Sequence, residues 1–176
     1  MSAIPTLVLW TTVVATAFVV APPVDEAASF GPGAVPLGVL VGLGLFAMLA
    51  RRRVHLGAWV RNSRRRVLAR CAVLVTRSAY EEAVWRGLLL GALLPLGRLQ
   101  ALLVGSTLFA AAHVPRLGAR AATHLWTGAA FGGIYLLTGA LEAAIAAHAA
   151  YNVAIGLALL AETCPVRPID APGTAS

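Results

Sequence analysis

Charged residues are scarce in this chain: only 12% of its 176 residues are charged, whereas 59% are hydrophobic and the mean hydropathy is +0.81. A soluble domain carries about 25% charged residues, so this composition excludes an ordinary soluble protein and is typical of a membrane protein. Alternation of apolar and polar residues is also missing, and long runs of Ala, Leu, Val and Gly favour helices over a barrel. The only cysteines are Cys71 and Cys164, which excludes a disulfide framework.

The apolar runs predict about six transmembrane helices, because roughly 20 apolar residues span a bilayer as a helix. The predicted spans are residues 4–20, 37–50, 71–94, 99–114, 121–137 and 141–161. We therefore expect an all-α, polytopic membrane helix bundle that forms one domain. Its expected parts are two N-terminal spans and a basic loop in residues 1–70, a catalytic four-helix core in residues 71–162 and a disordered tail in residues 163–176.

Basic charge is concentrated between the second and third predicted spans, where eight of the 14 arginines lie from Arg51 to Arg70. Nucleic-acid binding is one interpretation of such a run. Between two apolar spans the positive-inside rule is the stronger explanation, and it places this loop in the cytoplasm. Residues 54–70 are expected to lie on the anionic leaflet as an amphipathic helix. With six spans, both termini are then cytoplasmic.

Ionisable and amide side chains inside the predicted spans carry the strongest functional signal, since a charge at membrane depth costs several kcal/mol. Three of the spans carry such groups: Glu81, Glu82, Arg86, His113, His148 and Asn152. Together, carboxylate, imidazole and amide groups supply a base, a ligand for water or metal, and oxyanion donors. That combination suits the hydrolysis of an acyl bond.

Helical spacing predicts how these groups pair. Glu82 and Arg86 are four residues apart and share a helix face, whereas Glu81 lies about 100° round the helix and is freer to act as a base. The alternative is a structural salt bridge with a spare glutamate. His148 and Asn152 also share one face, where the alternative is a hydrogen bond between helices.

The order of the motifs resembles a known family. Glu-Glu-x-x-x-Arg at residues 81–86, Phe-x-x-x-His at 109–113 and His-x-x-x-Asn at 148–152 are similar to the motifs of the CAAX protease and bacteriocin-processing (Abi) family of intramembrane endopeptidases. The stretch Phe131–Gly139 is similar to that family as well. The resemblance covers residues 80–152 and implies proteolysis within the membrane.

Site roles follow from the resemblance, residue by residue. It implies that Glu81 and His113 activate a water molecule. His148 and Asn152 would stabilise the oxyanion. His113 taken alone is equally well explained as a capping or interfacial histidine at the end of its span.

Glu82 and Arg86 would orient the site. The motifs require no cofactor, and a metal-free water is the favoured nucleophile. Zn²⁺ held by Glu81, His113 and His148, with an open fourth position, stays an alternative. The sequence contains no His-Glu-x-x-His motif that would demand the metal.

The resemblance implies an endopeptidase that hydrolyses a peptide bond in a membrane-anchored or lipid-modified protein or peptide, for example to remove a C-terminal sorting anchor. The partners are then this substrate and the lipid bilayer, without nucleic acid. Basicity from Arg alone and the small size favour a bacterial inner membrane. The alternative is a non-catalytic membrane immunity or scaffold protein of the bacteriocin self-immunity type, in which the site residues are structural.

Overall fold

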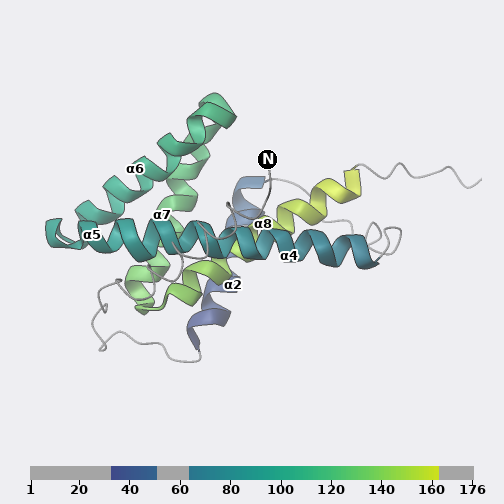
Figure 1. Cartoon of the computed structure of the whole chain (residues 1–176), viewed down its shortest axis with the longest axis horizontal. Coiled ribbons are helices and arrows are strands. Elements are labelled where there is room, and N and C mark those ends of the chain that lie inside the picture. The colour runs from purple at the N-terminus through teal and green to yellow at the C-terminus, as the bar shows by residue number, and fades with distance from the viewer. Residues whose placement is uncertain (1–32, 51–63, 163–176) are drawn as a thin grey trace, which may run out of the picture.

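The computed structural model describes residues 33–50 and 64–162, and helices account for nearly all of them. No strand occurs in these two ranges, so the expected all-α fold is confirmed for this part of the chain. The first predicted span, most of the basic loop and the predicted tail lie outside the described residues. Figure 1 shows a long rod, a hairpin that rises from one end of it, and two further helices that cross beside it.

The rod consists of four consecutive helical segments: α4 (Arg64–Glu82), the π-helical η4 (Ala83–Leu90), α5 (Gly91–Leu93) and the 3₁₀-helical η5 (Leu94–Leu96). The helix begins at Arg64, so the prediction that residues 64–70 belong to a separate interfacial segment is wrong. No Gly or Pro interrupts residues 64–86, and Arg, Leu and Ala are good helix formers, so the span simply extends into the basic region.

The hairpin pairs α6 (Arg98–Leu117) with α7 (Thr123–Thr138) through the short 3₁₀ helix η6 (Gly118–Ala122). The helix α7 ends at Gly139, whose φ of 69° is left-handed and whose N–H donates to the Tyr135 carbonyl at 2.8 Å. A glycine suits this position because other residues are strained there. The turn η6 returns the chain so that the start of α7 lies beside the end of α6.

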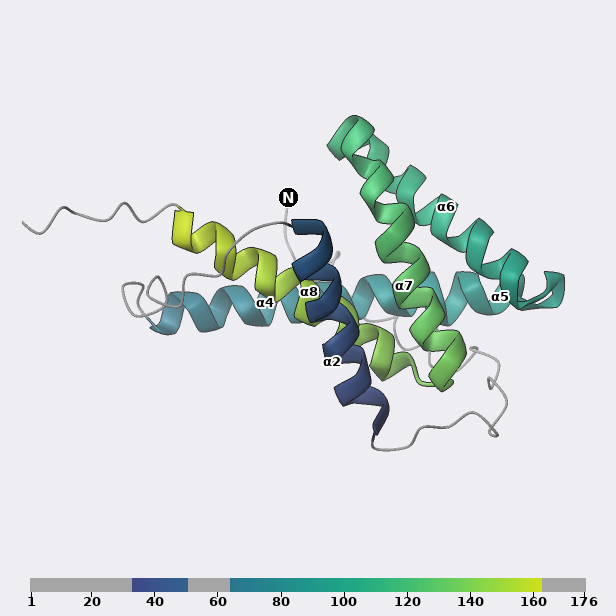
Figure 2. The same cartoon turned by 180° about the vertical axis from the view of Figure 1, so that it is seen from behind.

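The last helix, α8 (Leu141–Glu162), packs against α4 and is crossed by α2 (Ala34–Leu45) and its π-helical extension η3 (Phe46–Ala50). Figure 2 shows α2 lying across α8. The crossing is close because α2 presents Gly38 and Gly42, where a methyl group would overlap the backbone carbonyls of Ala143 and Ala147. Small residues allow such approach between helices in a bilayer.

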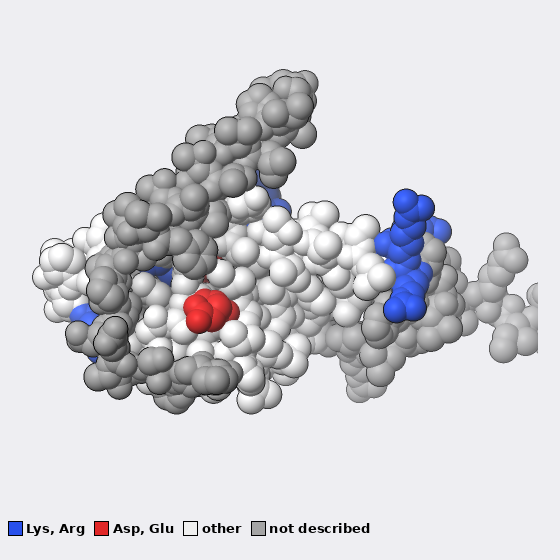
Figure 3. Space-filling model, turned by 60° about the horizontal axis from the view of Figure 1, so that its bottom comes forward, with Lys and Arg blue, Asp and Glu red and all other residues white. Residues whose placement is uncertain are grey.

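Polarity is inverted relative to a soluble protein. Glu82 is 0% exposed and Arg86 3%, whereas Leu40 is 67% and Trp126 68% exposed. Figure 3 shows a face with few charged side chains, apart from one acidic spot and a basic group at the end of the molecule where α4 begins. Such a surface suits contact with lipid tails, while the buried polar groups are satisfied inside the bundle.

Two helical stretches are long and apolar enough to cross a membrane, Arg98–Thr138 and Leu141–Leu160, and Ala34–Leu49 is a shorter apolar helix. The first stretch contains the whole α6–α7 hairpin. The protein is thus an all-helical integral membrane protein. The figure of six spans stays a prediction, because residues 4–20 are not among those described.

Candidate active site

Glu82 lies at the centre of the site, where α4 and α8 pack together. Its Oε1 accepts a hydrogen bond from His148 Nδ1 at 2.7 Å, and its Oε2 lies 3.1 Å from Arg86 Nε. The carboxylate is fully buried. A group without access to water cannot activate a water molecule, so Glu82 is suited to holding its two partners in place.

Arg86 connects the site to the hairpin. Its Nη2 donates to the Gly128 carbonyl at 3.0 Å, and its guanidinium carbon lies 4.9 Å from the ring centre of Phe109 and 5.8 Å from that of Phe131. Aromatic faces attract a cation at this distance. Within the described residues, Arg86 Nη1 has no hydrogen-bond partner, and Glu82 Oε2 meets Arg86 only as an ion pair.

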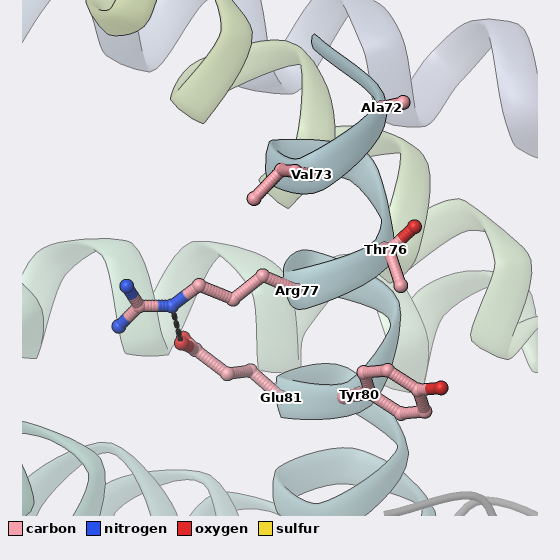
Figure 4. A pocket seen from close by; sticks show the side chains of 6 residues that line it. All are labelled: Ala72, Val73, Thr76, Arg77, Tyr80 and Glu81. Atoms are coloured by element: carbon pink, nitrogen blue, oxygen red, sulfur yellow. Dashed lines mark hydrogen bonds and ion pairs between the residues drawn. The ribbon is translucent and has the colours of Figure 1, made fainter. Parts of the chain in front are cut away.

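Glu81, by contrast, faces open space. Its side chain is 18% exposed, and its Oε1 accepts a hydrogen bond from Arg77 Nε at 2.7 Å, one turn earlier on α4 (Figure 4). This pair borders an open pocket of about 600 Å³, whose other lining residues are Ala72, Val73, Thr76 and Tyr80. Glu81 is therefore the carboxylate of the pair that water and substrate can reach.

A second open pocket, of about 560 Å³, shares Glu81 and Arg77 with the first. Its remaining lining residues are Trp85, Ala112, His113, Pro115 and Arg116. This pocket brings the third-span carboxylate and the fourth-span histidine of the predicted site to one opening, although they come from helices that are far apart in the sequence.

His148 is held in one orientation. Its Nδ1 must carry the proton, because its partner at 2.7 Å is the Glu82 carboxylate. Its other nitrogen, Nε2, then lies 3.8 Å from Glu81 Oε2. The ring stacks on Phe131 with centres 4.7 Å apart and planes 20° apart. The histidine thus spans the two adjacent glutamates.

His113 also has a defined tautomer. Its Nδ1 lies 2.8 Å from the carbonyl oxygen of Phe109, one turn earlier, so Nδ1 donates and Nε2 keeps its lone pair. The Phe109 ring contacts the imidazole with centres 4.7 Å apart. The four-residue spacing of Phe-x-x-x-His accounts for both contacts, since residues i and i+4 are neighbours on a helix face.

Asn152 lies one turn beyond His148 and binds elsewhere. Its Nδ2 donates to Ser78 Oγ at 3.0 Å, and Ser78 Oγ donates to the Leu74 carbonyl at 2.9 Å. This is the hydrogen bond between helices that was the alternative for Asn152, and it fixes α8 against α4. The second N–H of the amide is not used by this bond.

Sequence reasoning missed three neighbours of the site: Arg77, Ser78 and His124. The first two lie four residues before Glu81 and Glu82, so helical spacing alone could have found them. His124 lies on α7, and no local spacing points to it.

The metal alternative finds no preformed ligand cluster. No three His, Cys, Asp or Glu side chains within residues 33–50 and 64–162 are arranged to hold a metal ion. The expected ligands Glu81 and His148 already have other partners, since Arg77 lies on the first and Glu82 on the second. The side chains as arranged do not fit a metal centre, and we derive no step through one.

Comparison with known proteins gives one match. The family model described as type II CAAX prenyl endopeptidase Rce1-like matches residues 63–154, which is more than half of the 176-residue chain. The matched region contains all three motifs and runs from the start of α4 into α8. No curated protein and no solved structure matches the chain.

Proposed function

The chain belongs to the family of Rce1-like type II CAAX prenyl endopeptidases, and from this premise we propose that it hydrolyses a peptide bond in a membrane-anchored or lipid-modified protein, using a water molecule activated by Glu81. Family membership supports an intramembrane endopeptidase. The individual residue roles rest on the geometry of the site.

The contact of His148 with both glutamates carries the proposal. Glu81 Oε2 and His148 Nε2 are 3.8 Å apart, which is too long for a direct hydrogen bond. One water molecule beside them can donate to both, at about 2.8 Å each. Both acceptors then draw on the water protons, and the oxygen lone pairs point away from them, toward a substrate carbonyl.

Each proton is accounted for in this mechanism. The water oxygen forms a bond to the carbonyl carbon while its proton passes to Glu81. Collapse of the tetrahedral intermediate breaks the carbon–nitrogen bond, and the departing amine takes a proton from Glu81 or from His148. The products are a carboxylate and an amine, and no oxidant or cofactor is consumed.

The hydrogen bond between His148 and Glu82 favours a division of roles that differs from the one the family resemblance implies. With Nδ1–H committed to Glu82, a neutral His148 has only an acceptor left at Nε2. It therefore suits the water better than the oxyanion. We propose that Asn152 supplies an oxyanion donor through its second N–H, and that His113 accepts a hydrogen bond in the pocket that it shares with Glu81.

The ion pair with Arg77 does not prevent Glu81 from acting as a base. Arg77 is 53% exposed, and ion pairs in contact with solvent contribute only about 0–1 kcal/mol. The guanidinium can move aside as a substrate carbonyl and its water approach. The fully buried partner of Glu82, Arg86, has no such freedom.

The decisive experiment compares wild type with Glu81→Gln on a panel of reporter proteins that carry C-terminal membrane anchors, with mass spectrometry of the new termini. Loss of a general base is expected to slow cleavage about 10²- to 10⁴-fold. Glu142→Gln is the matched control, because Glu142 is an exposed glutamate at the start of α8.

Three outcomes separate the hypotheses. Cleavage by wild type and Glu142→Gln but not by Glu81→Gln supports the enzyme. Equal cleavage by all three proteins refutes the role of Glu81. Absence of cleavage by every protein across the panel favours the immunity or scaffold alternative. Activity that disappears with a chelator and returns with Zn²⁺ would replace the metal-free water with a metal mechanism.

A further inference from the structure

His124 lies outside the three motifs but contacts one of their histidines. It occupies the first turn of α7, where η6 has returned the chain to the end of α6. Its ring stacks on His113 with centres 4.1 Å apart and planes 23° apart. The two imidazoles therefore lie face to face.

Few other groups restrain the His113 ring. Phe109 provides the carbonyl that accepts from Nδ1 and a ring contact at 4.7 Å. The neighbours Val114 and Pro115 on α6 are exposed and cannot pack on it. Among the described residues, the aromatic rings in contact with His113 are thus Phe109 and His124.

One hydrogen bond at Nδ1 leaves the imidazole plane free to tilt about that bond. A ring stacked on its face removes this freedom. His124 is itself restrained, because its Nδ1 lies 3.4 Å from Thr123 Oγ1 and its ring lies 5.6 Å from that of Phe109. The three rings form one packed group at the junction of α6 and α7.

We propose that His124 is a positioning residue that keeps His113 Nε2 directed into the pocket shared with Glu81. This inference rests on the proposed function, since it assumes that His113 takes part in the reaction. His124 itself does not line that pocket. Its contribution comes from the aromatic face, so neither its charge nor its ring nitrogens are required.

The requirement for a face rather than a nitrogen defines the variants. His124→Phe keeps a flat ring and removes the nitrogens, whereas His124→Leu and His124→Gln remove the ring. An aromatic pair is worth about a two- to tenfold change. The Leu and Gln variants are expected to lower kcat two- to tenfold with unchanged KM, and the Phe variant is expected to stay near wild type.

A second measurement does not depend on turnover. Diethyl pyrocarbonate acylates the unprotonated nitrogen of a histidine, and peptide mapping resolves the rate at His113 from that at other histidines. His113 is expected to react faster when the stacked ring is removed, and at the wild-type rate in His124→Phe. Size-exclusion profiles of the purified variants check that the bundle is intact, and Gln serves where Leu does not accumulate.

His113→Ala separates failure of this inference from failure of the proposed function. If His113→Ala cleaves like wild type, the role of His113 in the proposed function is lost. If His113→Ala is inactive while His124→Leu matches wild type in kcat and in acylation rate, the positioning role is refuted and the enzyme stands. If His124→Phe is as slow as His124→Leu, the ring nitrogens are needed and the stacking argument is overturned.

Discussion

Arg86→Met tests the buried ion pair that organises the site. The substitution leaves the Glu82 carboxylate, which is 0% exposed, without its guanidinium partner and frees the Gly128 carbonyl from a 3.0 Å hydrogen bond. Loss of one member of a buried pair costs about 3–5 kcal/mol. His148 lies 2.7 Å from the same carboxylate and can compensate by taking a proton, so the lower end, about 3 kcal/mol, is expected.

For a chain of this size, about 3 kcal/mol corresponds to a fall in melting temperature of roughly 6–12 °C. Intrinsic tryptophan fluorescence of detergent-solubilised protein can follow unfolding, because the chain contains four tryptophans. Arg120→Met is the matched control, since Arg120 is exposed. A melting temperature of Arg86→Met within about 1 °C of wild type would refute the structural role and assign Arg86 to the substrate instead.

The double variant Glu82→Gln/Arg86→Met extends this test. Replacing both members removes the orphaned charge, so the double variant is expected to be more stable than Arg86→Met alone. Losses that simply add would show that Glu82 and Arg86 contribute independently. The design therefore measures the coupling between the two side chains as well as the cost of each.

Three further predictions concern packing, topology and the oxyanion. Gly42→Ala is expected to cost about 1–3 kcal/mol in a thermal melt because its methyl would meet backbone, whereas Gly44→Ala, which faces open space, should melt like wild type. A cysteine at Ser63, in a background without the two native cysteines, should resist an impermeant thiol reagent in intact cells, and ready labelling would invert the predicted orientation. Asn152→Ala is expected to lower kcat about 10²- to 10³-fold with little change in KM; the control Ser78→Ala removes only the bond between helices, and equal losses in both would deny Asn152 an oxyanion role.

The helices were predictable where apolar runs are uninterrupted. Predicted spans 99–114 and 141–161 agree closely with Arg98–Leu117 and Leu141–Glu162. The start of α4 was not predicted, because arginines were taken to mark a loop, although their helix propensity is high. Apolarity reports which residues lie in lipid, and a helix can continue beyond the bilayer.

The site was predictable where contacts are local. The pair Glu82 and Arg86 follows from a spacing of four residues on one helix, and the structure contains it at 3.1 Å. The contact of His148 with Glu82 joins residues 66 apart, and the stacking of His113 on His124 depends on the turn between α6 and α7. Periodicity identifies the face of a helix but not which helix packs on it or which ring nitrogen meets the partner.

The π-helical segment Ala83–Leu90 makes the length of this stretch of chain critical. A π segment accommodates residues that an α-helix of the same rise has no room for, and such segments are frequent at functional sites. Deletion of one residue within it would let the α-helix run on, and everything after the deletion would turn by about 100° relative to α4. Arg86 would then point away from Glu82 even though every side chain of the site was still encoded. The segment should therefore tolerate conservative substitutions at its lipid-facing positions far better than any insertion or deletion.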